Sequence, residues 1–202
     1  MSSVVVIFMS DKQSYHHGNA REALLDTAEA LIREKGISSF SLRAIARDVG
    51  IDPSACYRHF KNKEALLHGI ASRGFTTLSK KMIEADNGES SRDAIINMGN
   101  AYVEFALADP LVFQIMFGGC GLPALDERLK EPTVEHTAFE TLQQALLRYF
   151  VSSNESEDKL EATTMDIWSA VHGVAALSAF DAIIMDRDSR TAMIQRLVIS
   201  IL

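Results

Sequence analysis

The chain has 202 residues, of which 47% are apolar and 23% charged, and its net charge is −7. This length and composition are ordinary for a globular protein with one or two full-sized cores. The acidic total would argue against a nucleic-acid partner, but the charge is uneven. Residues 10–81 carry twelve Lys/Arg against eight Asp/Glu, and the remainder carries eight against nineteen. The distribution therefore indicates a modestly basic N-terminal part on an acidic body.

The N-terminal arm, residues 1–14, has no role that the sequence reveals. Its apolar run Val4–Met9 is too short to span a bilayer and lacks a basic flank, which excludes a membrane segment and a signal peptide there. The two cysteines, Cys56 and Cys120, lie far apart in the chain, and no secretion signal precedes them. We therefore expect free thiols and a cytoplasmic protein.

A first helix is predicted over residues 19–36. The Asn19 side chain can cap its start while Glu22 bonds back, and Lys35 and Gly36 supply a cation and a glycine stop at its end. Its apolar positions form one buried stripe: Leu24, Leu25, Ala28, Leu31 and Ile32.

Residues 41–67 predict two short helices joined at a tight corner, followed at once by another helix. The apolar face of the first is Leu42, Ile45, Ala46 and Val49, at helical spacing. Gly50 suits a left-handed helix end, Asp52 can cap a new helix, and Pro53 fits its first position. This is a helix-turn-helix arrangement, in which the second helix is presented to DNA.

A helical corner of this kind can also be a core feature without any partner. What favours DNA is the polar cluster that follows the corner: Tyr57, Arg58, His59, Lys61 and Lys63. Exposed arginines such as Arg47 are more commonly solvated, and His16-His17 is either part of a DNA-reaching arm or a frayed polar leader.

The rest of the chain predicts further helices and no convincing strand, so the expected fold is all-α. The expected elements are helices over 62–83, 91–109 and 110–117, a glycine-rich loop over 118–123, and helices from about 132, over 157–185 and over 189–202. Asn62 and Asp109 are the expected caps of the first and third of these helices. The chain segment 86–88 is expected to be a loop.

Trp168 and His172 share a helix face, and Gly173 follows them. They either line a ligand cavity between helices or form a core, with Trp168 as an anchor and Gly173 permitting close helix approach. The same choice applies to the Met and Phe positions that could outline an apolar pocket. Those positions are Phe105, Phe113, Met116, Phe117 and Phe139.

No pattern predicts a metal, a cofactor or an enzyme. The histidines at 16, 17 and 136 and Glu135 have no spacing that closes a metal site. There is no H-E-x-x-H, G-x-S-x-G or phosphate-binding glycine loop. Cys56 could act as a redox switch on the second helix of the corner, although a buried helical cysteine is the usual case.

The chain resembles the TetR/AcrR family of bacterial transcriptional regulators over about its first 75 residues. The residues that carry the resemblance are Phe40-Ser41-Leu42, Ile45-Ala46, Val49-Gly50, Tyr57-Arg58-His59-Phe60 and Lys63-Glu64-Ala65-Leu66, with 15–36 resembling the first helix of the family. Trp168, His172 and Gly173 resemble the Trp-His-Gly signature of one C-terminal subfamily. The resemblance implies a DNA-binding domain over 15–62 and a helical effector-binding and dimerisation domain over 63–202, with 63–83 as the connecting helix.

The resemblance also implies roles for individual residues. Ser41 and Arg43 would meet phosphates at a helix start. Pro53, Ser54 and Ala55 would face base edges, and Arg58 would reach guanine. Tyr57, His59 and Lys63 would hold the DNA backbone. Two residues depart from the family pattern: Asp52 stands where Ser or Thr is usual, and Cys56 stands where Leu or another apolar residue is usual.

The family resemblance implies a homodimeric repressor that binds a pseudo-palindromic double-stranded operator. The dimer would form through about 157–185 and 189–202, and a small apolar or amphipathic effector would release the DNA. The effector pocket would draw on the Met and Phe positions above with Trp168 and His172. Two rival interpretations are a helical enzyme or small-molecule carrier with a merely structural head, and a protein–protein adaptor. Operator binding that weakens with salt distinguishes the regulator from both.

Overall fold

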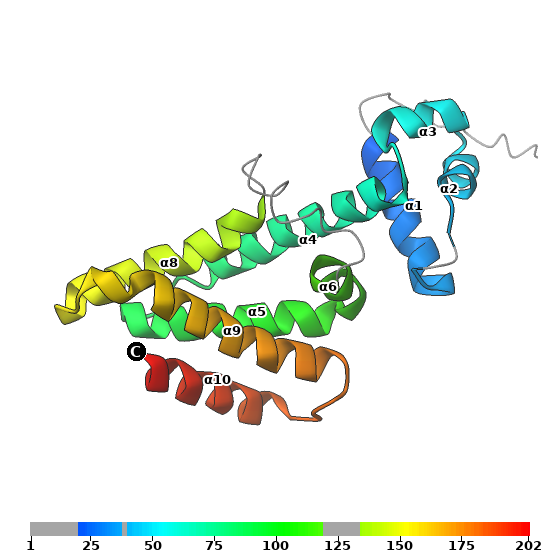
Figure 1. Ribbon diagram of the computed structural model, residues 1–202. Coiled ribbons are helices and arrows are strands. Elements are labelled where there is room, and N and C mark those ends of the chain that lie inside the picture. The colour runs from blue at the N-terminus through cyan, green and yellow to red at the C-terminus, as the bar shows by residue number, and fades with distance from the viewer. Residues whose placement is uncertain (1–19, 38–39, 119–133) are drawn as a thin grey trace, which may run out of the picture. The chain divides into compact units, whose positions relative to one another are not determined.

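The computed structural model describes residues 20–37, 40–118 and 134–202, with side chains of the last segment from Ala138 onward. Within these residues there are nine α-helices, one 3-10 helix and no strand, which confirms the all-α prediction (Figure 1). The chain divides into two compact units, Met1–Phe60 and Lys61–Leu202. Several expected features lie outside the described residues: the arm 1–14, His16 and His17, the Asn19 cap, the loop beyond Gly118 with Cys120, and a helix start at 132.

The first unit contains α1 (Ala20–Lys35), α2 (Leu42–Val49) and α3 (Pro53–His59). Its corner has the predicted left-handed Gly50, with a φ of 76°, and the predicted Asp52 cap, whose Oδ1 accepts from the Ser54 N–H at 2.7 Å. Ser41, for which only a phosphate contact was predicted, caps α2, because its Oγ accepts a hydrogen bond from the Ala44 N–H at 3.2 Å. The core unites apolar side chains from all three helices: Leu24, Leu25, Ala28, Ile32, Phe40, Leu42, Ile45, Ala46, Cys56 and Phe60.

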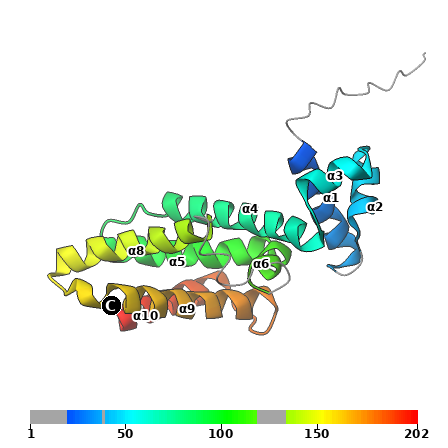
Figure 2. The same cartoon turned by 45° about the horizontal axis from the view of Figure 1, so that its top comes forward.

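The second unit is a bundle of long helices. They are α4 (Lys63–Glu84), α5 (Ser91–Ala108), α6 (Pro110–Phe117), α8 (Val134–Ser153), the 3-10 helix η2 (Glu157–Lys159), α9 (Leu160–Ala179) and α10 (Arg187–Ile201). In both views α8 lies along α4, α9 along α5, and α10 along α9 (Figure 1, Figure 2). The predicted caps are present, because Asn62 Oδ1 accepts from the Ala65 N–H and Asp109 Oδ1 from the Val112 N–H.

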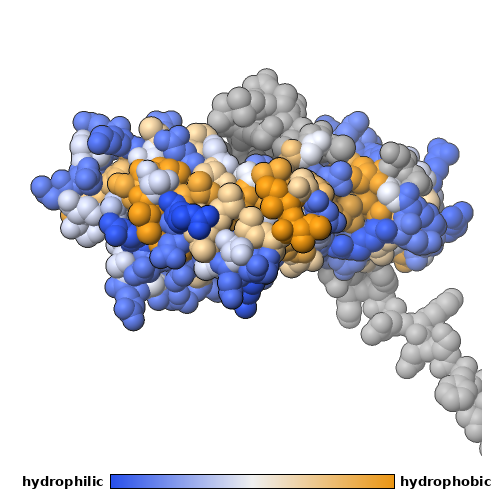
Figure 3. All heavy atoms as spheres, turned by 90° about the horizontal axis from the view of Figure 1, so that it is seen from below, coloured by the Kyte–Doolittle hydropathy of each residue, from blue (hydrophilic) through white to orange (hydrophobic). Residues whose placement is uncertain are grey.

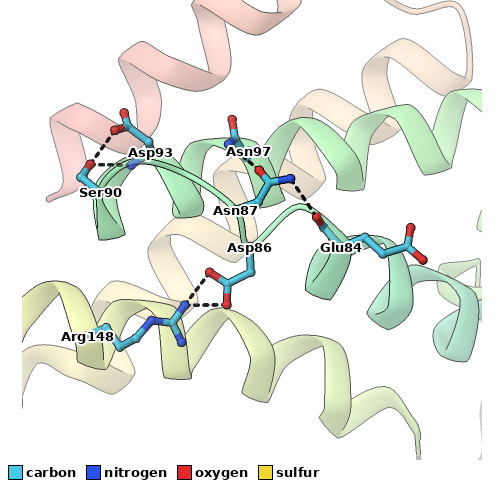
Figure 4. Close-up of polar contacts among 7 residues, drawn as sticks. All are labelled: Glu84, Asp86, Asn87, Ser90, Asp93, Asn97 and Arg148. Carbon is cyan, nitrogen blue, oxygen red and sulfur yellow. Dashed lines mark hydrogen bonds and ion pairs between the residues drawn. The ribbon is translucent and has the colours of Figure 1, made fainter.

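The corner between α4 and α5 is the predicted loop, and it is tied to a third helix. One Arg148 nitrogen, Nη2, donates to both carboxylate oxygens of Asp86 at 2.6 Å (Figure 4). Asn87 donates to the Glu84 carbonyl at 3.1 Å, and the Ser90 side chain accepts from the Asp93 N–H. These contacts stop α4, start α5 and join the corner to α8.

One helix prediction was wrong at both of its ends. The single helix expected over 157–185 is interrupted at both ends: 157–159 form a 3-10 turn, and α9 ends at Ala179. Asp181 takes a left-handed φ of 54° and the Ile183 N–H bonds back to the Leu177 carbonyl. Because the sequence there stays apolar and contains no glycine or proline, its periodicity carried no stop signal.

The glycine expected to permit close helix approach, Gly173, does not do so within the described part of this chain. A Cβ built on Gly173 meets nothing within 4 Å. That role belongs to two glycines on other helices. A Cβ on Gly74 would lie 2.5 Å from Met116 Sδ, and one on Gly99 would lie 2.9 Å from Ile194 Cγ2. Gly74 therefore lets α6 sit against α4, and Gly99 lets α10 sit against α5.

The left-handed backbone at Gly50 gives a first prediction. Gly50→Ala should lower the free energy of unfolding of the first unit by about 1–2 kcal/mol, because an L side chain is strained at this φ. Amide hydrogen exchange of α1–α3 measures this local stability. Gly173→Ala is the matched control: it is helical with open space around it, and we expect it to raise stability by about 0.5–1 kcal/mol. Equal effects at the two sites would contradict the assignment.

Candidate functional site

The outward face of α3 is the first candidate site. Pro53, Ser54, Tyr57, Arg58 and His59 are exposed, and Tyr57 keeps 45% of its surface accessible although it is a large aromatic residue. Cys56 and Phe60 are fully buried on the opposite face, and Ala55 is half-buried. One side of this short helix therefore anchors it, and the other side exposes aromatic, cationic and hydroxyl groups.

The remaining residues expected to meet DNA come from other helices. Ser41 and Arg43 are exposed at the start of α2, and the Ser41 side-chain oxygen already caps that helix. Lys63 is the first residue of α4 in the second unit and is half-buried. Lys61, the residue directly after the first unit, is exposed. It was not among the residues predicted to contact DNA, although it belongs to the polar cluster that favoured DNA binding. Arg47 is exposed and pairs with Asp48 at 3.7 Å.

The Asp52 carboxylate, which departs from the family pattern, is occupied as a cap. Hydrogen bonds from the Ser54 side chain and backbone lower the pKa of Asp52, and the Arg58 charge lowers it further. The carboxylate is therefore ionised at neutral pH, and one of its oxygens is committed to the Ser54 N–H. This agrees with the prediction that Asp52 caps α3.

Cys56 lies in the core of the first unit. Its side chain has no accessible surface, its Sγ lies 3.7 Å from the Leu42 carbonyl oxygen, and burial raises the pKa of the thiol. Oxidants and metals react with the thiolate, which this environment disfavours. The geometry favours a packing role over a redox switch.

A second candidate site is a cleft in the second unit with a volume of about 280 Å³. It lies between α6 and the C-terminal half of α9, and no charged side chain is among the described residues that line it. The lining residues are Phe113, Gln114, Phe117, Gly118, His172, Ala176 and Phe180. Its polar groups are the Gln114 amide and the His172 ring, and the other side chains are apolar.

The structure brings three of the seven predicted effector residues to this cleft: Phe113, Phe117 and His172. Phe105 and Met116 are core residues with 4% and 0% exposure. Phe139 and Trp168 pack against each other with ring centroids 5.6 Å apart, and Trp168 borders only a void of about 10 Å³. A void of that size holds about one water molecule at most.

Sequence reasoning missed Gln114, Ala176 and Phe180. Gln114 carried a usable signal, because it is the one polar side chain in the helix PLVFQIMF. Phe180 did not, because the expected helix 157–185 ran straight through it.

A buried hydrogen bond positions the His172 ring. The Tyr102 hydroxyl lies 2.9 Å from His172 Nδ1, and Tyr102 is only 2% exposed. Burial raises the pKa of Tyr102 and lowers the pKa of His172, so both groups are neutral at pH 7. Two phenylalanine rings of α6 lie against the pair. The centroid of the His172 ring is 4.6 Å from that of Phe117 and 5.4 Å from that of Phe113.

The described residues show neither a metal site nor a membrane-spanning helix. Within 20–37, 40–118 and 134–202, no three His, Cys, Asp or Glu side chains come together in a way that could hold a metal ion. None of the helices described there is both long and apolar enough to cross a membrane.

Comparison with protein-family models gives two matches. The model of bacterial regulatory proteins of the tetR family matches residues 24–70, which include α2 and α3. The model of the tetracyclin repressor-like C-terminal domain matches residues 95–201, more than half of the chain.

Curated relatives carry related names. An uncharacterized HTH-type transcriptional regulator, YobS of Bacillus subtilis, is 26% identical over 93 residues, which are 46% of this chain and 49% of YobS. One from Haemophilus influenzae is 26% identical over 145 residues, 71% of this chain and 65% of the relative. The matched region thus spans between half and two thirds of these relatives.

Solved structures share the fold. A protein of unknown function from Rhodococcus sp. RHA1 has a TM-score of 0.78 at 25% identity, covering 94% of this chain and 98% of that one. The transcriptional regulator FadR from Bacillus subtilis, solved in complex with stearoyl-CoA, has a TM-score of 0.71 at 16% identity, covering 90% and 98%.

The buried thiol gives a second prediction. In a Cys120→Ser variant, Cys56 should react with a thiol reagent about a hundredfold or more slowly than in urea, which corresponds to a local opening cost of about 3 kcal/mol or more. The rate of thiol labelling, followed in the native protein and in urea, measures this difference. Labelling of the native protein at the unfolded rate would show an accessible thiol and revive the redox-switch hypothesis.

Proposed function

The chain belongs to the TetR family of bacterial regulatory proteins, and we propose that within this family it is a homodimeric, ligand-responsive repressor. A TetR-family protein is a DNA-binding transcriptional regulator, and the relatives of this chain are named as regulators rather than enzymes. The observation that carries the proposal is the two-sided α3, buried through Cys56 and Phe60 and exposed through Ser54, Tyr57, Arg58 and His59.

On this proposal, α3 enters the major groove. Pro53, Ser54 and Ala55 face base edges, and Arg58 donates to the O6 and N7 acceptors of guanine. Phosphate contacts position the helix and come from two groups of residues. One group is Ser41 and Arg43 at the start of α2, and the other is Tyr57, His59 and Lys63. The exposure of all but Ala55 and Lys63, which are half-buried, supports these roles.

The proposed dimer forms through α9 and α10. Figure 3 shows the second unit from below relative to Figure 1, which is the side where α10 and the α9–α10 loop lie. Apolar surface gathers on this side. Large apolar side chains remain exposed on these elements: Met165 at 52%, Leu177 at 44%, Ile184 at 94% and Ile199 at 47%. Exposed apolar surface of this kind is typical of an interaction surface. A two-fold axis would set two copies of α3 about 34–36 Å apart, one turn of DNA.

The proposed release mechanism is a population shift between two arrangements of the dimer, one preferred by DNA and one by an effector. The helix α4 is the proposed lever. Phe117, a wall of the cleft, packs against Phe75 of α4 with ring centroids 5.2 Å apart. The close packing of Met116 and Val112 on Gly74 joins the same two helices. A coupling of about 1–3 kcal/mol would suffice for regulation.

The Trp-His-Gly subfamily assignment remains a prediction. Only His172 of its three residues lines the cleft, while Trp168 is part of the aromatic core and Gly173 faces open space.

The experiment that tests the DNA-binding proposal is selection of bound duplexes from a random library with the purified protein. We expect a pseudo-palindromic motif. Arg58→Ala should cost about 1–3 kcal/mol of operator binding and relax selection at one base pair of each half-site. Unchanged base preference in the variant would refute this contact, and no enriched motif at all would refute the function.

Phosphate contacts predict a different signature. Tyr57→Ala and Lys63→Ala should weaken binding to every duplex alike, and Lys63→Ala should lower the slope of log affinity against log salt by about 1. Lys80→Ala, an exposed lysine on the same helix, is the matched control and should leave the slope unchanged. A loss at Lys63 confined to the operator would contradict a phosphate role.

The proposed dimer surface gives a further prediction. Ile199→Asp on α10 should weaken dimerisation by about a hundredfold or more, because an unpaired carboxylate would be buried at the interface. Val151 lies near the end of α8 and is 68% exposed, so Val151→Asp should not weaken dimerisation. Sedimentation of both variants across a concentration series gives the dissociation constants, and indistinguishable constants would rule out this interface.

A further inference from the structure

The cleft between α6 and α9 has a hydrogen-bond donor that the fold leaves unused. Tyr102 is buried, and its hydroxyl has His172 Nδ1 as its hydrogen-bond partner among the described residues. Nδ1 is the one partner that the described residues give this O–H, and a buried O–H without an acceptor is costly, so we take the hydroxyl as the donor and Nδ1 as the unprotonated nitrogen. The proton of a neutral ring is then on Nε2. The described residues offer no partner to Nε2 of this half-buried ring, which lines the cleft.

The walls of the cleft are rings. Phe113 and Phe117 lie 5.0 Å apart at 51° to each other, and Phe180 lies 6.3 Å from Phe113, between centroids. Phe180 is 50% exposed, so about half of its surface remains open to contact with an occupant of the cleft. Aromatic side chains arranged at such angles pack well against the faces and edges of a flat ligand.

The polar lining sets the charge of the occupant. Burial lowers the pKa of His172, and no cation is among the described lining residues, so a carboxylate would find no counter-charge among them. A ligand without any acceptor would leave the His172 N–H unsatisfied. The side-chain amide of Gln114 is a second group that could donate to or accept from a polar substituent.

The size of the cleft sets the shape of the occupant. Its volume of about 280 Å³ is near the lower end of ligand pockets, which suits a compound of one or two rings. In the described core behind Tyr102 and Trp168, the neighbouring void measures only about 10 Å³. Among the described residues, this void is too small to hold part of a long acyl chain.

We propose that the Phe113–Phe117–His172 cleft binds a neutral, planar ring compound with one hydrogen-bond acceptor, which receives the His172 Nε2–H. The proposal rests on the ligand-responsive regulator proposed above, for which it names the effector class. Binding would press on Phe117, which touches Phe75 of α4, and would draw the exposed Phe180 onto the ligand. The site would therefore report its occupancy to the helix proposed as the lever.

The test uses the full chain and four probes. Acetophenone and 2-acetylnaphthalene are neutral ring ketones, 2-naphthoate is the anionic counterpart, and 2-ethylnaphthalene lacks an acceptor. Calorimetry gives the affinities, and nitrogen NMR of histidine-labelled protein reports the His172 ring, with His172→Gln used to assign its signals. We expect the free protein to show the Nε2–H tautomer, and 2-acetylnaphthalene to shift the Nε2 signal and bind about tenfold more tightly than 2-ethylnaphthalene.

Variants locate the binding. His172→Phe keeps a ring but removes the donor and should erase the tenfold preference for the ketone. Gln114→Leu should weaken ketone binding, whereas Gln144→Leu, an exposed glutamine on α8, is the matched control and should not. If His172→Phe fails to fold, the tautomer and the ketone-induced shift in the unaltered protein still decide the question.

Three outcomes would overturn the proposal: an Nδ1–H tautomer, tighter binding of 2-naphthoate than of either ketone, or no binding of either ketone. These failures are separable from failure of the proposed function, because operator binding is measured without any probe. A chain that selects an operator but ignores the ketones keeps its function and loses this ligand class. A chain that binds the ketone and no DNA keeps the site and loses the regulator.

Discussion

The structure of the first unit depends on anchoring a helix that is too short to be stable alone. With seven residues, α3 is well below the length of about 12–15 residues at which isolated helices become even marginal in water. Its stability comes from the cap at Asp52, the proline at its first position, and the burial of Cys56 and Phe60. Because that anchoring uses only one side, the other side is free to carry Tyr57, Arg58 and His59. A cysteine at the anchoring position is then a packing solution, because a small thiol fits where α3 meets the Leu42 carbonyl.

In the second unit the corresponding constraint is close packing at α6. This helix of eight residues contributes to the core through Val112, Phe113, Ile115 and Met116 and lies against α4 where Gly74 removes a side chain. A well-packed contact of this kind transmits a displacement, because protein interiors have few voids that could absorb it. The cleft borders the same helix through Phe113, Gln114 and Phe117. One short element therefore touches both the proposed ligand and the proposed lever, so a coupling pathway requires no residues beyond those already in contact.

The sequence predicted best those features that have a local cause. The caps at Asp52, Asn62 and Asp109 and the left-handed Gly50 were predicted, because each depends on one residue and the backbone next to it. The end of α9 was not, because Asp181 adopts a left-handed backbone in a run that contains no usual stop signal. The cleft was predicted only in part, since periodicity gives the apolar positions of a helix but not which of them face a gap. Thus Met116 and Phe113, which are three residues apart, have different surroundings: one is wholly core and the other borders the cleft.

The pair Tyr102 and His172 shows why such a site depends on tertiary contacts. The two residues are 70 positions apart, and neither has a distinctive local motif that would indicate a hydrogen bond. On the proposed tautomer this contact sets the chemistry of the cleft, because a buried tyrosine that donates to Nδ1 leaves Nε2 of the imidazole as a donor. If the histidine were charged, the cleft would accept anions; if it were the other tautomer, it would favour ligands that donate. The proposed specificity is therefore set by a tyrosine that is not among the described lining residues.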